Sequence, residues 1–297
     1  MFLERFINYL QFEKRYSPHT VAAYRSDLEQ FFAHLTIGGG TPQSPSEISH
    51  HDIRAWMVTL MDEDKRSARS VNRKVATLRK YFKFLLQEQV IDVNPAARVN
   101  TPKVPKTLPV VVEDYKLARM LDNETVFDGS FESQRDKLVI ELLFGTGIRL
   151  AELLGLTDAD YNAHEGTIKV LGKRNKQRIV PVNRELSVLL AGYIELKKIQ
   201  NFDNNLLTLI VTNKGANAYP KLIYLIVQKY LSYISTQKKR SPHVLRHTFA
   251  TTLLNKGADL NSIKELLGHA SLSATQVYTH NSVERLKSIY KLAHPKA

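Results

Sequence analysis

Two stretches decide the fold of the C-terminal part of this chain: S-P-H-V-L-R-H-T-F-A at residues 241–250 and L-L-G-H-A-S-L-S-A-T-Q-V-Y-T-H at residues 266–280. Ser241 followed by Pro242 is typical of a helix start, because serine can cap free amides and proline fits the first helical turn. A second helix is expected over residues 260–267, closed by the glycine that follows it. The two stretches therefore predict two helices and then a short polar segment.

The polar side chains of these stretches suit an attack on a phosphodiester. Such an attack builds negative charge on the non-bridging oxygens, and the planar, permanently charged fork of Arg246 can donate two parallel bonds to them. Tyr278 needs nearby cations or a proton acceptor to act as a nucleophile, because a phenol has an ordinary pKa of about 10. Histidine can donate or accept protons near neutral pH. The pattern predicts that Tyr278 is the nucleophile and that His243, Arg246 and His269 hold or protonate the phosphate.

Each of these residues also has a plainer interpretation. A tyrosine in a segment rich in serine and threonine is often a half-buried ring, and His243 with Arg246 can form a solvated helix face. His243 and His247 have the i, i+4 spacing of a metal pair. However, Val244 stands where an H-E-x-x-H helix has its glutamate. The chain has no cysteine, and this stretch has no obvious third carboxylate ligand.

The ordered set H-x-L-R-H, L-G-H and, nine residues later, Y-T-H resembles the signature of the tyrosine recombinase (phage integrase) family. Members of this family cut DNA through a phosphotyrosine, and the resemblance implies an earlier arginine and a lysine. The stretch G-T-G-I-R-L-A-E-L-L-G-L at residues 145–156 matches the family pattern G-x-R-x-x-E-L, which implies that Arg149 is the first catalytic arginine. The family lysine falls on Lys173, beside Arg174, where many relatives have glycine.

The residues around these two positions carry their own structural expectations. Gly145 and Gly147 are expected to break a helix, and Arg149 to begin the next one, within reach of Glu152 one turn on. The alternating stretch T-I-K-V-L-G-K-R-N-K-Q-R-I-V-P-V at residues 167–182 predicts two strands, Thr167–Leu171 and Arg178–Val182, around a polar turn. Its crowded positive charge is also typical of an edge that discourages aggregation.

Composition narrows the class of partner and excludes some chemistry. The net charge of +13 and the pI of about 9.7 favour a polyanionic partner. The chain has no cysteine, which excludes disulfides, thiolate metal sites and a cysteine nucleophile. No apolar run is long enough to span a bilayer and no signal segment opens the chain, so we expect a cytoplasmic protein without a membrane partner.

The pattern along the chain predicts a mainly α fold with two domains and a small β-hairpin or sheet in the second. Residues 1–94 read as amphipathic helices with starts at Ser17, Ser49 and Ser67 or Ser70, which makes a compact helical domain. Residues 95–110 form a basic, proline-rich linker, expected to be extended, and residues 111–297 form the second domain, with a tail helix over 282–292. The stretch S-P-H-T-V-A-A-Y-R-S-D-L-E-Q-F at residues 17–31 resembles the SAM-like core-binding domain of the Xer subgroup.

One helix of the first domain is unusually basic. It has two interpretations, a phosphate-contacting face or an ordinary solvated one. Its cations are Arg69, Arg73, Lys74, Arg79, Lys80 and Lys83.

The resemblance also implies the activity, the assembly and the absence of a cofactor. It implies a site-specific recombinase that works through a 3′-phosphotyrosyl bond, without metal or ATP, on double-stranded DNA. It implies a homo- or hetero-tetramer on DNA with a second recombinase, and, for chromosome-dimer resolution, a cell-division translocase as activator. The alternatives are an integrase or transposase of a mobile element, a DNA inversion enzyme, a type IB topoisomerase, a metal-dependent nuclease and a DNA-binding protein without catalysis. The C-terminal helix docks either within its own chain or on a neighbouring protomer.

Overall fold

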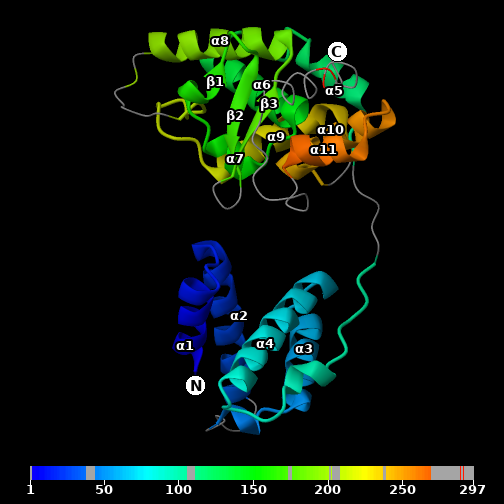
Figure 1. Cartoon of the computed structure of the whole chain (residues 1–297). Coiled ribbons are helices and arrows are strands. Elements are labelled where there is room, and N and C mark those ends of the chain that lie inside the picture. The colour runs from blue at the N-terminus through cyan, green and yellow to red at the C-terminus, as the bar shows by residue number, and fades with distance from the viewer. Residues whose placement is uncertain are drawn as a thin grey trace. The chain divides into compact units, whose positions relative to one another are not determined.

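The chain forms two compact units, Met1–Thr107 and Leu108–Ala297, each with its own core (Figure 1). The computed structural model describes residues 2–37, 44–105, 111–172, 176–200, 202, 208–236, 239–268, 288 and 290.

The described residues of the first unit form helices and no strand. In chain order these are α1 (Leu3–Asn8), the π-helix η1 (Tyr9–Glu13), α2 (Pro18–Ile37), the 3-10 helix η2 (Pro45–Glu47), α3 (His50–Asp62), α4 (Ala68–Gln87) and the 3-10 helix η3 (Pro95–Arg98). The predicted helix starts are confirmed by their caps. Ser49 forms a capping box with Asp52, and the hydroxyl of Ser67 accepts a hydrogen bond from the backbone amide of Ser70.

A buried carboxylate, Asp27, ties α2 to the basic helix α4. It accepts hydrogen bonds from both Nη atoms of Arg73, from Lys74 Nζ at 2.9 Å and from Thr77 Oγ1 at 2.9 Å. Asp27 and Lys74 are only 2% and 4% exposed. Removing either one would leave the other as a buried, unpaired charge, which is strongly destabilising. Lys74 therefore belongs to the core and not to an outer basic face of α4, which corrects the interpretation of this helix as a uniform row of surface cations.

The predicted linker begins as a packed strap. Ala96 and Val99 are buried in the first core, and Arg79 donates to the carbonyls of both residues. Asn72 Nδ2 then donates to the Pro102 carbonyl at 3.0 Å. The chain after Asn94 is therefore held against α4 instead of being extended from Pro95. Its apolar side chains are buried in the first core, and its carbonyls accept hydrogen bonds from Arg79 and Asn72.

The described elements of the second unit are eight α- and 3-10 helices and three strands. They are α5 (Asp114–Leu121), α6 (Phe131–Thr146), α7 (Leu150–Leu154), the 3-10 helix η4 (Asp158–Asp160), β1 (Tyr161–Asn162), β2 (Thr167–Leu171), β3 (Gln177–Pro181), α8 (Arg184–Ile199), α9 (Pro220–Ile234), α10 (Pro242–Asn255) and α11 (Leu260–Leu267). The predicted mainly α fold with a small sheet is confirmed. The strand β1 was not predicted, and β3 begins one residue before the expected Arg178.

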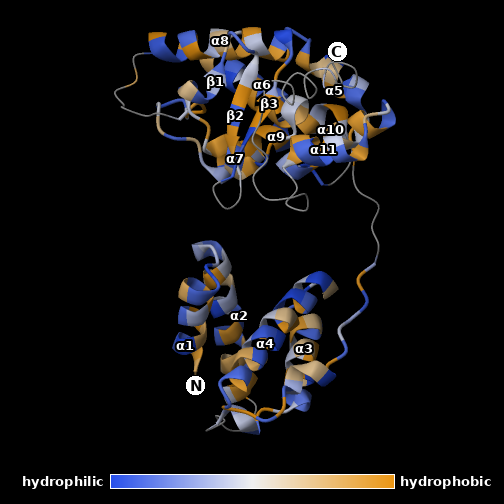
Figure 2. Cartoon of the chain, viewed as in Figure 1, coloured by the Kyte–Doolittle hydropathy of each residue, from blue (hydrophilic) through white to orange (hydrophobic). Residues whose placement is uncertain are grey.

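Helix α6 is the centre of the second unit. It packs against α7, α8, α9 and α10, and its residues from Leu138 to Thr146 are buried on every side. Figure 2 shows the contrast with α8, along which hydrophilic and hydrophobic residues alternate. Gly145 lies within α6, so the expectation that it breaks the helix is wrong. Gly147 ends the helix, with a left-handed φ of +62°.

The strands form a small antiparallel sheet in the order β1-β2-β3. In the β2–β3 hairpin, Val170 pairs with Arg178 and Ile168 pairs with Val180. The backbone amide of Gly172 donates to the Lys176 carbonyl at 2.7 Å, which closes the turn at the tip. Lys173, the next residue in the sequence, lies outside the described residues.

A smaller apolar cluster joins the two helices of the C-terminal stretches. It contains Phe249 and Leu253 of α10, Leu266 of α11 and Tyr290, whose hydroxyl donates to the Gly145 carbonyl at 2.8 Å. Tyr290 and Ser288 are the described residues of the predicted tail helix, and the rest of 282–292 lies outside the described part of the chain. Tyr290 thus contacts the core of its own chain.

None of the helices in the described ranges combines the length and the apolar character needed to cross a membrane.

Candidate active site

Three arginines from three different elements converge on the C-terminal end of α11. Arg149 Nη2 donates to the Gly268 carbonyl at 3.1 Å, Arg178 Nε to the Leu266 carbonyl at 2.9 Å and Arg246 Nη2 to the Leu267 carbonyl at 2.8 Å. The last carbonyls of a helix have no partners within the helix and form the negative end of its dipole. The end of α11 therefore holds the three guanidinium groups together.

Arg149 reaches this position because α6 ends sharply. At Gly147 a Cβ atom would lie 2.9 Å from Phe249 Cε1 and 3.0 Å from Leu267 Cδ2, so the chain turns where only glycine fits. Arg149 is then the residue before α7, where its backbone amide donates to Glu152 Oε2 at 2.7 Å. Its side chain is 39% exposed, which leaves part of its fork open to solvent.

Arg246 approaches the same place from α10 and is only 6% exposed. Its Nη1 donates to the carbonyl of Gly147, so it also fixes the turn that precedes Arg149. Burial, followed by the positive charge of Arg149, lowers the pKa of the Arg246 guanidinium to about 10. Arg246 is therefore still charged at neutral pH.

Glu152 is the one carboxylate in contact with these arginines among the described residues. It accepts bonds from Arg178 Nη1 at 2.8 Å and Nη2 at 2.9 Å, and from Arg149 Nη1 at 2.8 Å. Burial alone would raise the pKa of Glu152, but the hydrogen bonds and charge of Arg178, and then the bonds from Arg149, lower it to about 2. Three guanidinium groups and one carboxylate leave this cluster with a net charge of +2.

His243 lies on α10, three residues before Arg246, and is exposed. Ser241 precedes the helix as predicted, but its side chain makes no capping bond, so proline alone marks this start. His247 is half-buried on the next turn. The structure thus brings Arg149 and Arg246 together, with His243 on the helix that carries Arg246.

The other predicted site residues, Lys173, His269 and Tyr278, lie outside the described residues. Two of them directly follow described segments that border the arginines. Gly172 is packed so that a Cβ atom would lie 3.5 Å from Glu152 Oε1, and Gly268 so that one would lie 3.0 Å from Arg178 Nη1. The described neighbours of Lys173 and His269, which are Gly172 and Gly268, therefore lie at the edge of the cluster.

Sequence reasoning found the Arg149–Glu152 pair but missed the place of Arg178. Arg178 looked like one cation among several on a charged hairpin. In the structure it is 5% exposed and shares the inner side of β3 with Val180. The strand pattern offered a signal, because alternation places residues 178 and 180 on the same face.

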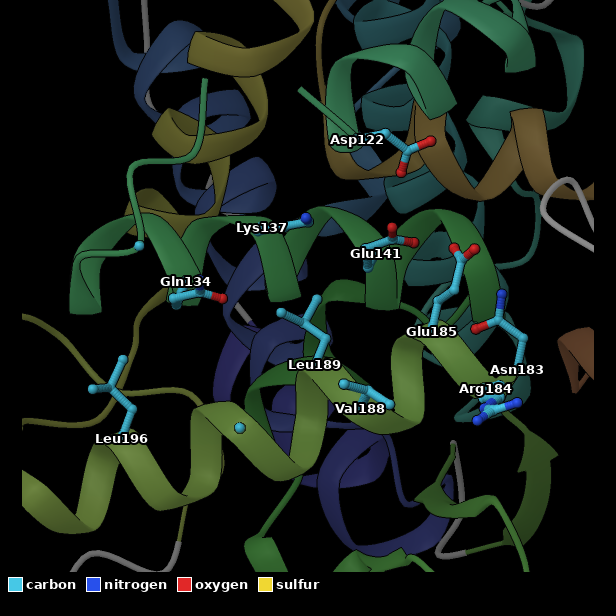
Figure 3. A pocket seen from close by; sticks show the side chains of 12 residues that line it. Asp122, Gln134, Lys137, Glu141, Asn183, Arg184, Glu185, Val188, Leu189 and Leu196 are labelled. Carbon is cyan, nitrogen blue, oxygen red and sulfur yellow. The ribbon is translucent and has the colours of Figure 1, made fainter. Parts of the chain in front are cut away.

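A separate cavity of about 850 Å³ lies between α6 and α8 (Figure 3). Asp122, Glu141 and Glu185 line one end of it, and Val188 and Leu196 of α8 line its wall. None of the residues that line it belongs to the arginine cluster. Within the described ranges, no three histidine, aspartate or glutamate side chains could together hold a metal ion.

Comparison with known proteins gives the chain two family matches. The model of the phage integrase family matches residues 115–285, and the model of the phage integrase N-terminal SAM-like domain matches residues 3–89.

Curated relatives match over almost the whole chain. The chain is 38% identical to a tyrosine recombinase XerC from Chlorobaculum parvum, over 99% of this chain and 94% of that protein. It is also 38% identical to a tyrosine recombinase XerC from Thermodesulfovibrio yellowstonii, over 99% of this chain and 96% of that protein.

Solved structures share the fold. The post-cleavage complex of the XerH site-specific recombinase with a palindromic difH substrate matches with a TM-score of 0.73 and 21% identity, over 96% of this chain and 82% of that chain. The Tn1549 transposon integrase bound to a circular intermediate DNA matches with a TM-score of 0.70 and 19% identity, over 96% of this chain and 98% of that chain.

Proposed function

Because this chain belongs to the phage integrase family of tyrosine recombinases, we propose that it cuts and rejoins DNA at specific sites through Tyr278. The observation that carries the proposal is that Arg149 and Arg246 meet at the end of α11, in a cluster that has a net charge of +2 when Arg178 and Glu152 are included. Fixed cations of this kind stabilise the charge that develops on a phosphate under attack, and they need no reorganisation when the reaction occurs.

In the proposed reaction the phenolic oxygen of Tyr278 forms a bond to phosphorus and the bond from phosphorus to the 5′ oxygen breaks. Arg149 and Arg246 bind the non-bridging oxygens, helped by His243. Lys173 gives a proton to the departing 5′ oxygen, and His269 orients the phosphate or takes part in proton transfer by accepting the proton that the Tyr278 phenol loses. One phosphodiester replaces another, so a 5′ hydroxyl from a second duplex can reverse the step and seal the strand.

No cofactor is needed for this chemistry. Two arginines and a lysine can offset the charge that Mg²⁺ offsets in other phosphoryl-transfer sites, and arginine keeps its charge at every physiological pH. The energy of the broken bond stays in the phosphotyrosine, so no ATP is consumed.

The biological role that we propose is of the Xer type. The relatives from Chlorobaculum parvum and Thermodesulfovibrio yellowstonii carry the name XerC and align with almost the full chain, which supports a role in chromosome-dimer resolution. On double-stranded DNA the protein would act as a tetramer, alone or with a second recombinase, and a cell-division translocase would activate it. Residues 1–94 would serve as the core-binding domain, 95–110 as the linker and 111–297 as the catalytic domain.

The test uses the whole protein and sheared genomic DNA from its source organism. Wild type and Tyr278→Phe are incubated with the DNA, the reaction is stopped with detergent, and DNA that is covalently bound to protein is recovered and sequenced. We expect wild type to yield adducts with protein on the 3′ end at a defined site, in the presence of EDTA, and Tyr278→Phe to yield none.

Other outcomes identify other functions. Cleavage that EDTA abolishes and Tyr278→Phe retains would indicate a metal-dependent nuclease. Binding without an adduct would indicate a DNA-binding protein, and adducts spread over unrelated sequences with relaxation of single plasmids would indicate a topoisomerase. A mapped site inside a mobile element would replace the chromosomal role by integration.

A further inference from the structure

Arg178 is the arginine of the cluster to which neither the motif nor the proposed reaction gives a task. It lies on β3, five positions after Lys173, and is 5% exposed. All three of its side-chain nitrogens are used: Nη1 and Nη2 donate to Glu152, and Nε donates to the Leu266 carbonyl. Arg246 donates both Nη atoms to carbonyls, whereas the fork of Arg178 is paired with a buried carboxylate that a phosphate would have to displace. We therefore expect Arg178 to act through its partners.

The first partner is Glu152, which also holds Arg149. Glu152 is ionised, since its pKa is about 2, and it lies between two cations. Arg178 supplies one positive charge to balance this carboxylate. Without it, the charge of Arg149 would be balanced by Glu152, and the nitrogen of Arg149 that now donates to the Gly268 carbonyl would be drawn toward the carboxylate.

The other partners of Arg178 are the two chain segments that lead to Lys173 and His269. A Cβ atom on Gly172 would lie 3.7 Å from Arg178 Nη1, and one on Gly268 would lie 3.0 Å from the same atom. A Cβ atom at Gly268 would crowd the guanidinium group, whereas one at Gly172 would make an ordinary van der Waals contact with it. Arg178 is bonded to the end of α11 through the Leu266 carbonyl, and it pairs with Val170 of β2 in the hairpin.

We propose that Arg178 is a positioning residue for strand cleavage: it balances the charge of Glu152, so that the charge and fork of Arg149 stay available to the phosphate, and it fixes the ends of β2 and α11. This inference rests on the proposed function. Arg178 does not touch the reacting atoms, so its loss should slow the covalent step without weakening the binding of DNA.

The experiment measures both quantities on the nicked duplex that carries the mapped cleavage site. Adduct formation is timed at saturating DNA, and DNA affinity is measured by fluorescence anisotropy in the Tyr278→Phe background. Arg178→Met is compared with Lys169→Met, which removes a half-exposed cation from the adjoining strand β2. We expect Arg178→Met to slow adduct formation about 10²-fold with an affinity within about twofold of wild type, and Lys169→Met to react at the wild-type rate.

Two further variants separate positioning from simple loss of the fold. Arg178→Lys keeps the charge without the bidentate fork and should recover at least tenfold of the lost rate. In a Glu152→Gln background there is no buried carboxylate to balance, so adding Arg178→Met should slow the reaction by less than about threefold, as expected for residues that act as a unit. Thermal unfolding of every variant sets a temperature at which all of them are folded.

A structural role alone predicts a different result. Arg178 does not position Arg149 if Arg178→Met forms the adduct as fast as Lys169→Met. The same conclusion holds if Arg178→Met slows adduct formation by the same factor in the wild-type and the Glu152→Gln backgrounds. If Arg178→Met does not fold, the doubly neutral Glu152→Gln/Arg178→Met and Arg178→Lys still give the comparison. Absence of any adduct from the wild type would overturn the proposed function, and this inference with it.

Discussion

At the scale of single residues, the site depends on one carboxylate that must stay ionised. Glu152 is 4% exposed on its side chain and is surrounded by cations. A buried carboxylate is costly when isolated, but here it receives four hydrogen bonds, three from side chains and one from the Arg149 amide. The stability of this arrangement should therefore depend on pH.

The pKa of Glu152 is lowered to about 2 from an ordinary value of 4.5, so its ionised form stabilises the fold above pH 4.5. This stabilisation is lost as the pH falls from 4.5 through 2. Between pH 7 and pH 3.5 the loss should be about 1.4 kcal/mol. We expect the difference in unfolding free energy between wild type and Glu152→Gln to narrow by that amount, as measured by urea denaturation at both pH values.

Glu165→Gln is the matched control, because it removes an exposed carboxylate from the turn before β2. If the difference in unfolding free energy between wild type and Glu152→Gln stays constant between pH 7 and pH 3.5, the pKa of this carboxyl is not lowered by folding.

The residue scale is also where sequence reasoning was most uneven. The pairing of Arg149 with Glu152 is local, one helical turn apart, and was predicted correctly. The burial of Arg178 and of Lys74 depends on partners 26 and 47 positions away, respectively. No local periodicity reports such a partner, so both residues looked like surface cations. The roles of Lys173, His269 and Tyr278 stay predictions.

At the scale of elements, the serine, proline and glycine residues at helix ends predicted most of the helix boundaries well. Leu260–Leu267 was expected to end at Gly268, and α11 does so with a φ of +63°. The error at Gly145 has a physical cause, since a buried helix packed on four neighbours gains more from continuing than a single glycine costs. The break comes at Gly147, where the backbone must turn toward Arg149.

Gly147→Ala should therefore be one of the more damaging small substitutions in the second unit. Alanine would adopt a left-handed conformation, at about 1 kcal/mol or more, and its Cβ atom would press on the ring of Phe249 and on Leu267. Together with overpacking of the core we expect about 2–4 kcal/mol of destabilisation, measured by urea denaturation.

Gly129→Ala provides the control for this prediction. Gly129 has a φ of +80°, but a Cβ atom there would meet nothing within 4 Å. Gly129→Ala should therefore lower the free energy of unfolding only by the cost of the left-handed backbone, about 1 kcal/mol. Equal destabilisation by Gly129→Ala and Gly147→Ala would show that the contact with Phe249 adds nothing.

At the scale of the whole molecule, charge and motif order predicted more than any single element did. The net charge of +13 indicated a polyanion, and the ordered motifs indicated the family, which the matches over residues 3–89 and 115–285 confirm. The charge count could not tell which cations face solvent. On α4, Arg73 and Lys74 contact Asp27, and Arg79 contacts carbonyls of the strap.

The exposed cations of α4 without a recorded ion pair or side-chain hydrogen bond in the described structure are Arg69 and Lys83. These two should carry whatever phosphate contact the helix makes. Each phosphate contact contributes about one unit to the slope of log affinity against log salt concentration. We expect the double variant Arg69→Gln/Lys83→Gln to lower that slope by about two, with weaker binding at every DNA sequence tested.

Arg79→Gln should leave the slope unchanged and destabilise the first unit, because its partners are the Ala96 and Val99 carbonyls. An unchanged slope in the double variant would assign the outer face of α4 to solvent and leave DNA binding to the rest of the molecule.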